Sequence, residues 1–236
     1  MNPLLKLAIA RNLLRKYRQL SYQWRSNRQV RHDGFDRRHG TETTRIVQTR
    51  DRLGCSVNWY ETASETAILA AIDGLDLERH GFNVKRTSFV DLGCGKGKPL
   101  LVASRYPFAR IVGVDIDAGC LEIAHKNTAI CGLEERIELM MADAIAYDLP
   151  AGPLLLYLYN PFPGWVLQRV IDKLAKRLKH STDPIAITYL NPCSLDIIER
   201  SGLFRKVSET EGHSSSYERS VGFISMGNLD RSSSTE

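Results

Sequence analysis

Residues 89–97 have the sequence Phe-Val-Asp-Leu-Gly-Cys-Gly-Lys-Gly, and this stretch decides the fold of the chain. Its first residues belong to a short apolar run that begins at Ser88 and is typical of a buried β-strand. The glycines at positions 93, 95 and 97 permit positive φ angles and let backbone N–H groups approach a ligand closely. Pro99 suits the first turn of a helix, where its missing N–H is not needed. The stretch therefore predicts a strand, a ligand-binding turn and a helix in direct succession.

The sequence around this turn alternates between further strands and helices. Apolar stretches of strand length occur at residues 88–91, 110–115, 136–142, 154–159, 185–190, 204–209 and 220–226. Helical spacing of apolar residues is found at 64–77, from 118 to a stop at Gly132, at 166–178 and at 195–201. This alternation predicts an α/β fold with a doubly wound, mostly parallel sheet. Ligands of such sheets lie at the carboxyl ends of the strands, where the glycine-rich turn is expected.

The pattern of the turn excludes two phosphate-binding motifs. A dinucleotide fingerprint needs glycine at the sixth position counted from Gly93, where Lys98 stands. A P-loop needs glycine five residues before Gly97, where Leu92 stands, and Ser or Thr in place of Pro99. The remaining pattern, acid-x-Gly-x-Gly-x-Gly, resembles motif I of the class I methyltransferases that depend on S-adenosylmethionine (SAM).

This resemblance covers about residues 87–192 and implies a Rossmann-like class I methyltransferase fold. The implied sheet has seven mostly parallel strands, an antiparallel final strand and helices on both faces. SAM is the implied cofactor and S-adenosylhomocysteine its product. Asp115, which ends the expected second strand, would hold the ribose, with Asp117 as the alternative. The pair Asp143–Ala144, which follows the expected third strand, would contact the adenine. The cofactor-binding residues implied are Asp91, Gly93, Cys94, Gly95, Gly97, Asp115, Ile116, Asp143 and Ala144, with Tyr60 and Thr62 either covering SAM or simply packing on the sheet.

The segment after the expected fourth strand carries the second motif, Tyr159-Asn160-Pro161-Phe162-Pro163. It resembles the [Asn/Asp]-Pro-Pro-aromatic signature of methyltransferases that act on amino groups. It is similar to the Asn-Pro-Phe form in a group of small bacterial methyltransferases, and more distantly to Dot1-like lysine methyltransferases. The aromatic residue here follows the first proline directly, which departs from the signature. The resemblance makes Asn160, Pro161 and Phe162 the candidate catalytic residues, and a purely structural turn is the alternative.

The net charge of +5 is unevenly distributed along the chain. Residues 1–32 carry eight of the 32 basic residues and no acidic one, so the other 24 basic residues are outnumbered by 27 acidic ones. Leucines at 4, 7 and 14 give this basic arm a helical pattern, which predicts a helix that packs on the domain, on a partner, on an anionic membrane surface or on nucleic acid. The expected division is a basic helical and irregular extension at 1–56, the methyltransferase domain at 57–228 and a mobile tail at 229–236. We expect the basic arm to be separable, so that a chain starting near Gly40 still binds SAM.

Composition and residue spacing limit the location, the metal content and the class of function that we expect. No apolar run approaches the length that a helix needs to cross a bilayer. The five cysteines lack CxxC spacing and the histidines lack metal-ligand spacing, so we expect free thiols, no metal and a cytoplasmic location, with peripheral membrane contact as an option. The favoured function is N-methylation of a protein lysine or another amino group. A nucleic-acid methyltransferase or RNA-binding protein guided by the basic arm, a small-molecule methyltransferase and a non-catalytic SAM-binding protein are the alternatives.

Overall fold

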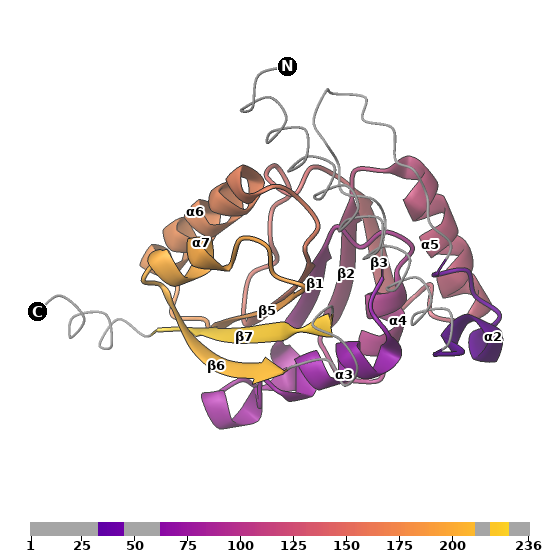
Figure 1. Cartoon of the computed structure of the whole chain (residues 1–236), viewed down its shortest axis with the longest axis horizontal. Coiled ribbons are helices and arrows are strands. Elements are labelled where there is room, and N and C mark those ends of the chain that lie inside the picture. The colour runs from indigo at the N-terminus through magenta and orange to yellow at the C-terminus, as the bar shows by residue number, and fades with distance from the viewer. Residues whose placement is uncertain (1–32, 45–61, 211–217, 227–236) are drawn as a thin grey trace, which may run out of the picture.

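The computed structural model describes residues 33–44, 62–210 and 218–226 (Figure 1). The basic arm at 1–32, the candidate lid residue Tyr60 and the tail at 229–236 lie outside the described residues. No helix among the described residues is long and apolar enough to span a membrane.

The described chain forms one seven-stranded sheet with the strand order β3-β2-β1-β4-β5-β7-β6. Every pair of neighbouring strands is parallel except those that involve β7, which is antiparallel to both β5 and β6. The strand order reverses between β1 and β4, which is where ligands of such sheets bind. The expected mostly parallel sheet is confirmed. Its strands are β1 Ser88–Leu92, β2 Arg110–Asp115, β3 Ile137–Met141, β4 Leu154–Tyr159, β5 Ile185–Leu190, β6 Phe204–Thr210 and β7 Ser220–Ser225.

Helices cover both faces of this sheet (Figure 1). The helices α3, α4 and α5 pack on one face, and α6 and α7 pack on the other. Successive residues of β1 point to opposite faces of the sheet. Phe89 therefore lies in the core under α3, α4 and α5, and Val90 lies in the core under α6 and α7. The helices are α2 Phe35–His39, α3 Glu65–Asp73, α4 Lys98–Ala103, α5 Ala118–Ile130, α6 Gly164–His180 and α7 Leu195–Arg200, with short 3₁₀ turns at Glu78–His80 and Val84–Arg86.

Residues 33–44, which the sequence placed in the extension, pack against the sheet domain. Phe35 is only 2% exposed and belongs to the same core as residues of α3 and α4. The carboxylate of Asp36 folds the end of the segment back onto α2. It accepts hydrogen bonds from the side chains of Thr41, Thr43 and Thr44 at 2.7–2.8 Å. Burial alone would raise the pKa of Asp36, but these hydrogen bonds hold it below its usual value. A helix as short as α2 and contacts of this kind leave no periodic signal, which is why the sequence indicated an irregular segment.

Candidate cofactor and acceptor site

The glycine-rich turn lies between β1 and α4, as the sequence predicted. Gly93, Gly95 and Gly97 all have positive φ angles of 84°, 51° and 83°. The N–H groups of Gly93 and Cys94 donate to the carbonyl oxygen of Val114 at 2.8 and 3.1 Å, which ties the turn to β2. Gly97 ends the turn at the start of α4. The backbone of the turn is therefore fixed against the carboxyl end of the neighbouring strand.

Beneath this turn lies a small cavity whose lining includes two buried polar residues with unmet hydrogen bonds. The Oδ2 atom of Asp91 and the Oγ1 atom of Thr62 find no hydrogen-bond partner among the described residues. Unpaired buried polar atoms are costly, so a native structure usually keeps them for a ligand or a water molecule. Burial, and secondly the nearby Asp115, raises the pKa of Asp91 well above its usual value. The cavity is lined by Thr62, Ala63, Asp91, Gly93, Cys94, Pro99, Tyr157 and Tyr159.

These features fit the methionyl end of SAM. That end carries an ammonium group, for which a buried carboxylate and a hydroxyl are suitable partners. Cys94 lies in the cavity wall, and burial raises the pKa of its thiol, so it offers a small neutral surface. Thr62 thus lies at the cavity, and its contribution to the cofactor site stays a prediction.

The two candidate ribose ligands have different roles in the structure. Asp115 ends β2, and its Oδ2 accepts a hydrogen bond from the N–H of Gly95 at 2.7 Å, so its carboxylate lies against the glycine turn. Asp117 is the N-cap of α5 and accepts from the N–H of Cys120 at 2.7 Å. Burial raises the pKa of Asp115. The Oδ1 of Asp115 also accepts a hydrogen bond from the N–H of Asp117 at 2.8 Å, so both carboxylates are engaged with the backbone. The ribose role of Asp115 stays a prediction, and its contact with the glycine turn is the geometric reason to prefer it over Asp117.

Replacing Asp115 with alanine should weaken SAM binding by about 10- to 100-fold. The reason is the loss of charge-assisted hydrogen bonds to the ribose, worth on the order of 1.5–3 kcal/mol. Calorimetric titration of the folded variant with SAM measures the change. Asp117→Ala is the matched control, which should mainly lower stability by about 1 kcal/mol through the lost helix cap. The opposite pattern, with affinity lost only in Asp117→Ala, would reverse the assignment.

The adenine side of the site combines exposed apolar groups with a locally bonded aspartate. Ile116 and Met141 are 51% and 70% exposed, and Met141 pairs with Asp115 in the sheet register. Asp143 is exposed, and its Oδ1 accepts from the N–H of Ile145 at 2.8 Å in the turn after β3. Ala144 packs against the core of the α6 face. The adenine role of the Asp143–Ala144 pair stays a prediction, and Met141 is an apolar neighbour that the sequence analysis did not identify.

The Asn-Pro-Phe segment lies against the glycine turn. A Cβ atom added to Gly93 would come closer than 3.0 Å to the Cβ of Pro161, so only a glycine at position 93 lets the two segments meet. Asn160 has a φ angle of 41°, a left-handed conformation that asparagine tolerates better than most residues. Its Oδ1 accepts a hydrogen bond from the hydroxyl of Tyr189 at 3.2 Å. Burial raises the pKa of Tyr189, so this hydroxyl keeps its proton and remains a donor.

The aromatic residues of this region differ from the expectation. Phe162 is only partly exposed and packs against the core of the α6 face, which commits its ring at least in part to packing. Tyr157 and Tyr159 line the cavity beside Asp91 instead. Tyr157 is paired with Asp91 across the two strands, and Tyr159 lies two residues further on the same face. Two tyrosines two positions apart in an otherwise aliphatic strand were the signal that could have identified them.

The strand order, the glycine turn and the acids at the strand ends are similar to those of the class I methyltransferase fold. Residues 89–181 match the family model described as a methyltransferase domain. No group of potential metal ligands occurs in the described part of the chain.

Two curated relatives and one solved structure illustrate the similarity. The chain is 34% identical over 105 residues to the rRNA N(6)-adenosine-methyltransferase metl-5 of Caenorhabditis elegans, covering 43% of this chain and 47% of the relative. It is 33% identical over 92 residues to the ribosomal protein L11 methyltransferase of Pectobacterium carotovorum, covering 35% and 29%. A ribosomal protein L11 methylase from Lactobacillus delbrueckii superposes with a TM-score of 0.49 at 18% identity, covering 71% and 80%. The chain therefore spans less than half the length of either curated relative.

Proposed function

We propose that the protein is a SAM-dependent methyltransferase that transfers a methyl group to an amino nitrogen. The contact between Gly93 and Pro161 carries this proposal, because it brings Asn160 next to the turn that would hold the cofactor. An asparagine amide offers both an acceptor and donors, which suits orienting an amine better than removing its proton.

The chain's own residues would mainly position the reactants. Bound SAM would supply an activated methyl group on a sulfonium, which makes a strong leaving group of the rest of the molecule. Asn160, with its amide oxygen held by Tyr189, would orient the acceptor nitrogen for in-line attack. Tyr159 and Pro161 would exclude water from the reacting atoms. An apolar surrounding also lowers the pKa of an amine, so a lysine acceptor would lose its proton more easily there.

A protein amine, above all a lysine side chain, is the acceptor we favour from the resemblance of the Asn-Pro-Phe segment. A nucleobase amine is the second candidate, favoured by the exposed face of α6. This face starts at Trp165, which is 58% exposed, and continues through the exposed residues Arg169, Lys176 and Lys179. Aromatic and basic side chains on one face suit stacking on bases and contact with phosphates. The name of the C. elegans relative refers to the same kind of acceptor nitrogen.

Transfer of a labelled methyl group distinguishes these candidates. The purified chain is incubated with a lysate and SAM carrying a labelled methyl group, and protein, RNA and small molecules are then separated. We expect label in the protein fraction, at an acid-stable methylated amine, and labelling about 100-fold slower with Asn160→Ala. Label confined to RNA would establish the second candidate. Label in neither macromolecule, despite SAM binding, would contradict both.

The buried carboxylate of Asp91 predicts how SAM binding depends on pH. Because burial raises the pKa of Asp91, a proton must leave this carboxyl before it can pair with the ammonium of SAM, so affinity should rise as the pH increases above the ordinary range of carboxyl pKa values. Asp91→Asn should weaken SAM binding about tenfold or more at pH 7 and remove this rise. The raised pKa of Asp91 in the folded protein also affects stability. It stabilises the fold at pH values below the ordinary carboxyl pKa, and this stabilisation is lost as the pH rises through the raised pKa of Asp91. The variant without ligand should therefore melt at a higher temperature than wild type at pH 7, as calorimetry would measure.

A further inference from the structure

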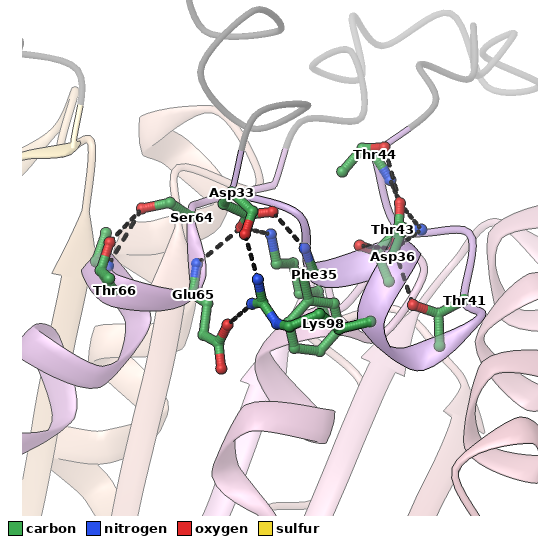
Figure 2. Close-up of polar contacts among 12 residues, drawn as sticks. Asp33, Phe35, Asp36, Thr41, Thr43, Thr44, Ser64, Glu65, Thr66 and Lys98 are labelled. Atoms are coloured by element: carbon green, nitrogen blue, oxygen red, sulfur yellow. Dashed lines mark hydrogen bonds and ion pairs between the residues drawn. The ribbon is translucent and has the colours of Figure 1, made fainter.

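The carboxylate of Asp33 contacts the first residues of three helices (Figure 2). Its Oδ1 accepts from the N–H of Phe35 at 2.9 Å, where α2 begins. Its Oδ2 accepts from the N–H of Glu65 at 3.1 Å, where α3 begins. The same Oδ2 accepts from the Nζ of Lys98 at 2.5 Å, and Lys98 is the first residue of α4. One carboxylate therefore joins three segments that are far apart in the sequence.

The placement of Lys98 explains why a carboxylate is needed. A cation at the first residue of a helix is unfavourable, because the N-terminal end of the helix dipole is positive. The side chain of Lys98 is fully buried, with its Nζ 5.1 Å from the centre of the Phe35 ring. Burial lowers the pKa of Lys98, whereas the hydrogen bond to Asp33 opposes this shift. A carboxylate, in contrast, is favoured at helix N-termini, and Asp33 lies at two of them.

A second polar bridge joins residues 33–44 to the glycine turn. The Nζ of Lys96, whose side chain is fully buried, forms an ion pair with Glu42 at 2.8 Å. The amide of Asn127, on α5, donates to the carbonyl oxygens of Lys96 at 3.0 Å and of Glu42 at 3.1 Å. Both lysines of the turn are thus held by the same upstream segment, which we call the clasp (residues 33–44).

The clasp connects the two walls of the cavity described above. One wall consists of Thr62 and Ala63, which come directly before the N-cap of α3. The other consists of Gly93, Cys94 and Pro99, in and after the glycine turn. Asp33 does not line the cavity, but it bonds to Glu65, which follows the first wall in sequence, and to Lys98, which directly precedes Pro99 of the second wall. It can therefore fix the spacing of the walls without touching a ligand.

We propose that Asp33 is a positioning residue for the cofactor site, acting through Lys98 and the start of α3 to hold the two cavity walls together. The inference rests on the SAM site of the proposed function and adds a residue from outside the region that matches the methyltransferase family model. It also opposes the expectation from the sequence that a chain starting near Gly40, which lacks Asp33, still binds SAM.

The test compares SAM affinity with thermal stability in three variants of the full chain. Asp33→Asn keeps one acceptor oxygen, which can serve the N–H of Phe35 or of Glu65 but not both, and leaves Lys98 buried without a counter-charge. Lys98→Met keeps the apolar stem over Phe35 but leaves Asp33 without its cation. The double variant Asp33→Asn/Lys98→Met removes both charges, so no unpaired buried charge remains. Calorimetric titration with SAM and with S-adenosylhomocysteine gives the Kd, and a melt without ligand gives the Tm.

Arg177→Met is the matched control. Arg177 is a half-buried cation on α6 that donates to the carbonyl oxygens of Pro150 and Gly152. These residues precede β4, so they lie at the ends of the parallel strands opposite the glycine turn. The control should lower the Tm without changing the Kd for SAM more than about twofold.

Asp33→Asn is expected to raise the Kd for SAM about tenfold or more and to lower the Tm. In the double variant the Tm should return toward the wild-type value while the Kd stays at least about fivefold raised. Recovery of affinity together with the Tm would make Asp33 a stabilising residue only and overturn the proposal, as would wild-type affinity in Asp33→Asn. If wild-type protein itself does not bind SAM, the proposed function fails, and this result is distinct from either of those outcomes.

Discussion

Replacing Asn160 with alanine is expected to lower the turnover number about 100-fold while the Kd for SAM stays within about threefold of wild type. The amide is expected to orient the acceptor nitrogen, and loss of an orienting contact beside the reacting atoms typically has an effect of this size. The affinity should hold because the contacts assigned to SAM come from the glycine turn, Asp91 and Asp115. Turnover is measured with the acceptor fraction identified by labelling, and the Kd by calorimetry on the same preparation.

The left-handed backbone at Asn160 requires two companion variants. Alanine at a φ of 41° is strained by roughly 1 kcal/mol, so Asn160→Gly, which removes the amide without this strain, should show the same loss of turnover. Asp76→Ala introduces the same strain at an exposed residue with a φ of 43°, in the loop after α3, and should leave turnover unchanged. Full turnover in Asn160→Gly would make the Asn-Pro-Phe segment a structural turn and remove the main reason for an amino acceptor.

Tyr189 offers a graded version of the same experiment. Its hydroxyl donates to the Oδ1 of Asn160, so Tyr189→Phe leaves the amide in place but removes one of the bonds that orient it. A loss of turnover smaller than that in Asn160→Ala would be consistent with a residue that acts through the amide.

The parts of the fold that local pattern determines could be predicted from the sequence. The strands at 110–115, 154–159 and 185–190 were expected with the bounds that the structure gives them, because a buried parallel strand is a continuous apolar run. The glycine turn was expected because three alternate glycines lie between a strand pattern and a helix pattern, and their spacing excluded two phosphate-binding motifs. Asp115 was placed at the turn because the carboxyl ends of parallel strands meet at one edge of the sheet.

The parts that depend on contacts between distant residues could not be predicted. Asp33 and Lys98 are 65 positions apart, and neither position has a periodic signal that would pair them. The aromatic residue of the Asn-Pro-Phe segment was expected at the acceptor, but whether a ring points toward the site or toward α6 depends on packing around Phe162. Local sequence gives the chemistry of a site, whereas the residues that position it come from the three-dimensional arrangement.

The meeting of the two motifs at Gly93 can be tested by a single methyl group. Gly93→Ala should place a Cβ atom too close to the Cβ of Pro161, so the glycine turn and the Asn-Pro-Phe segment must move apart. Overpacking of this kind typically costs about 1–3 kcal/mol, and alanine at a φ of 84° adds roughly 1 kcal/mol. Both costs fall on the cofactor turn, so we expect SAM affinity to fall about 100-fold and turnover to become undetectable.

Gly202→Ala separates the effect of the contact from the effect of the backbone. Gly202 has a φ of 63°, and a Cβ added there meets nothing within 4 Å, so this variant carries the strain without the clash. It should lose about 1 kcal/mol of stability and keep wild-type affinity for SAM. A second change, Pro161→Gly in the Gly93→Ala background, removes the clashing Cβ and should restore much of the affinity but not the turnover, because the acceptor side has then been altered. Equal effects of Gly93→Ala and Gly202→Ala on SAM affinity would mean that the two motifs do not meet in solution, and that Asn160 is not held at the cofactor turn by this contact.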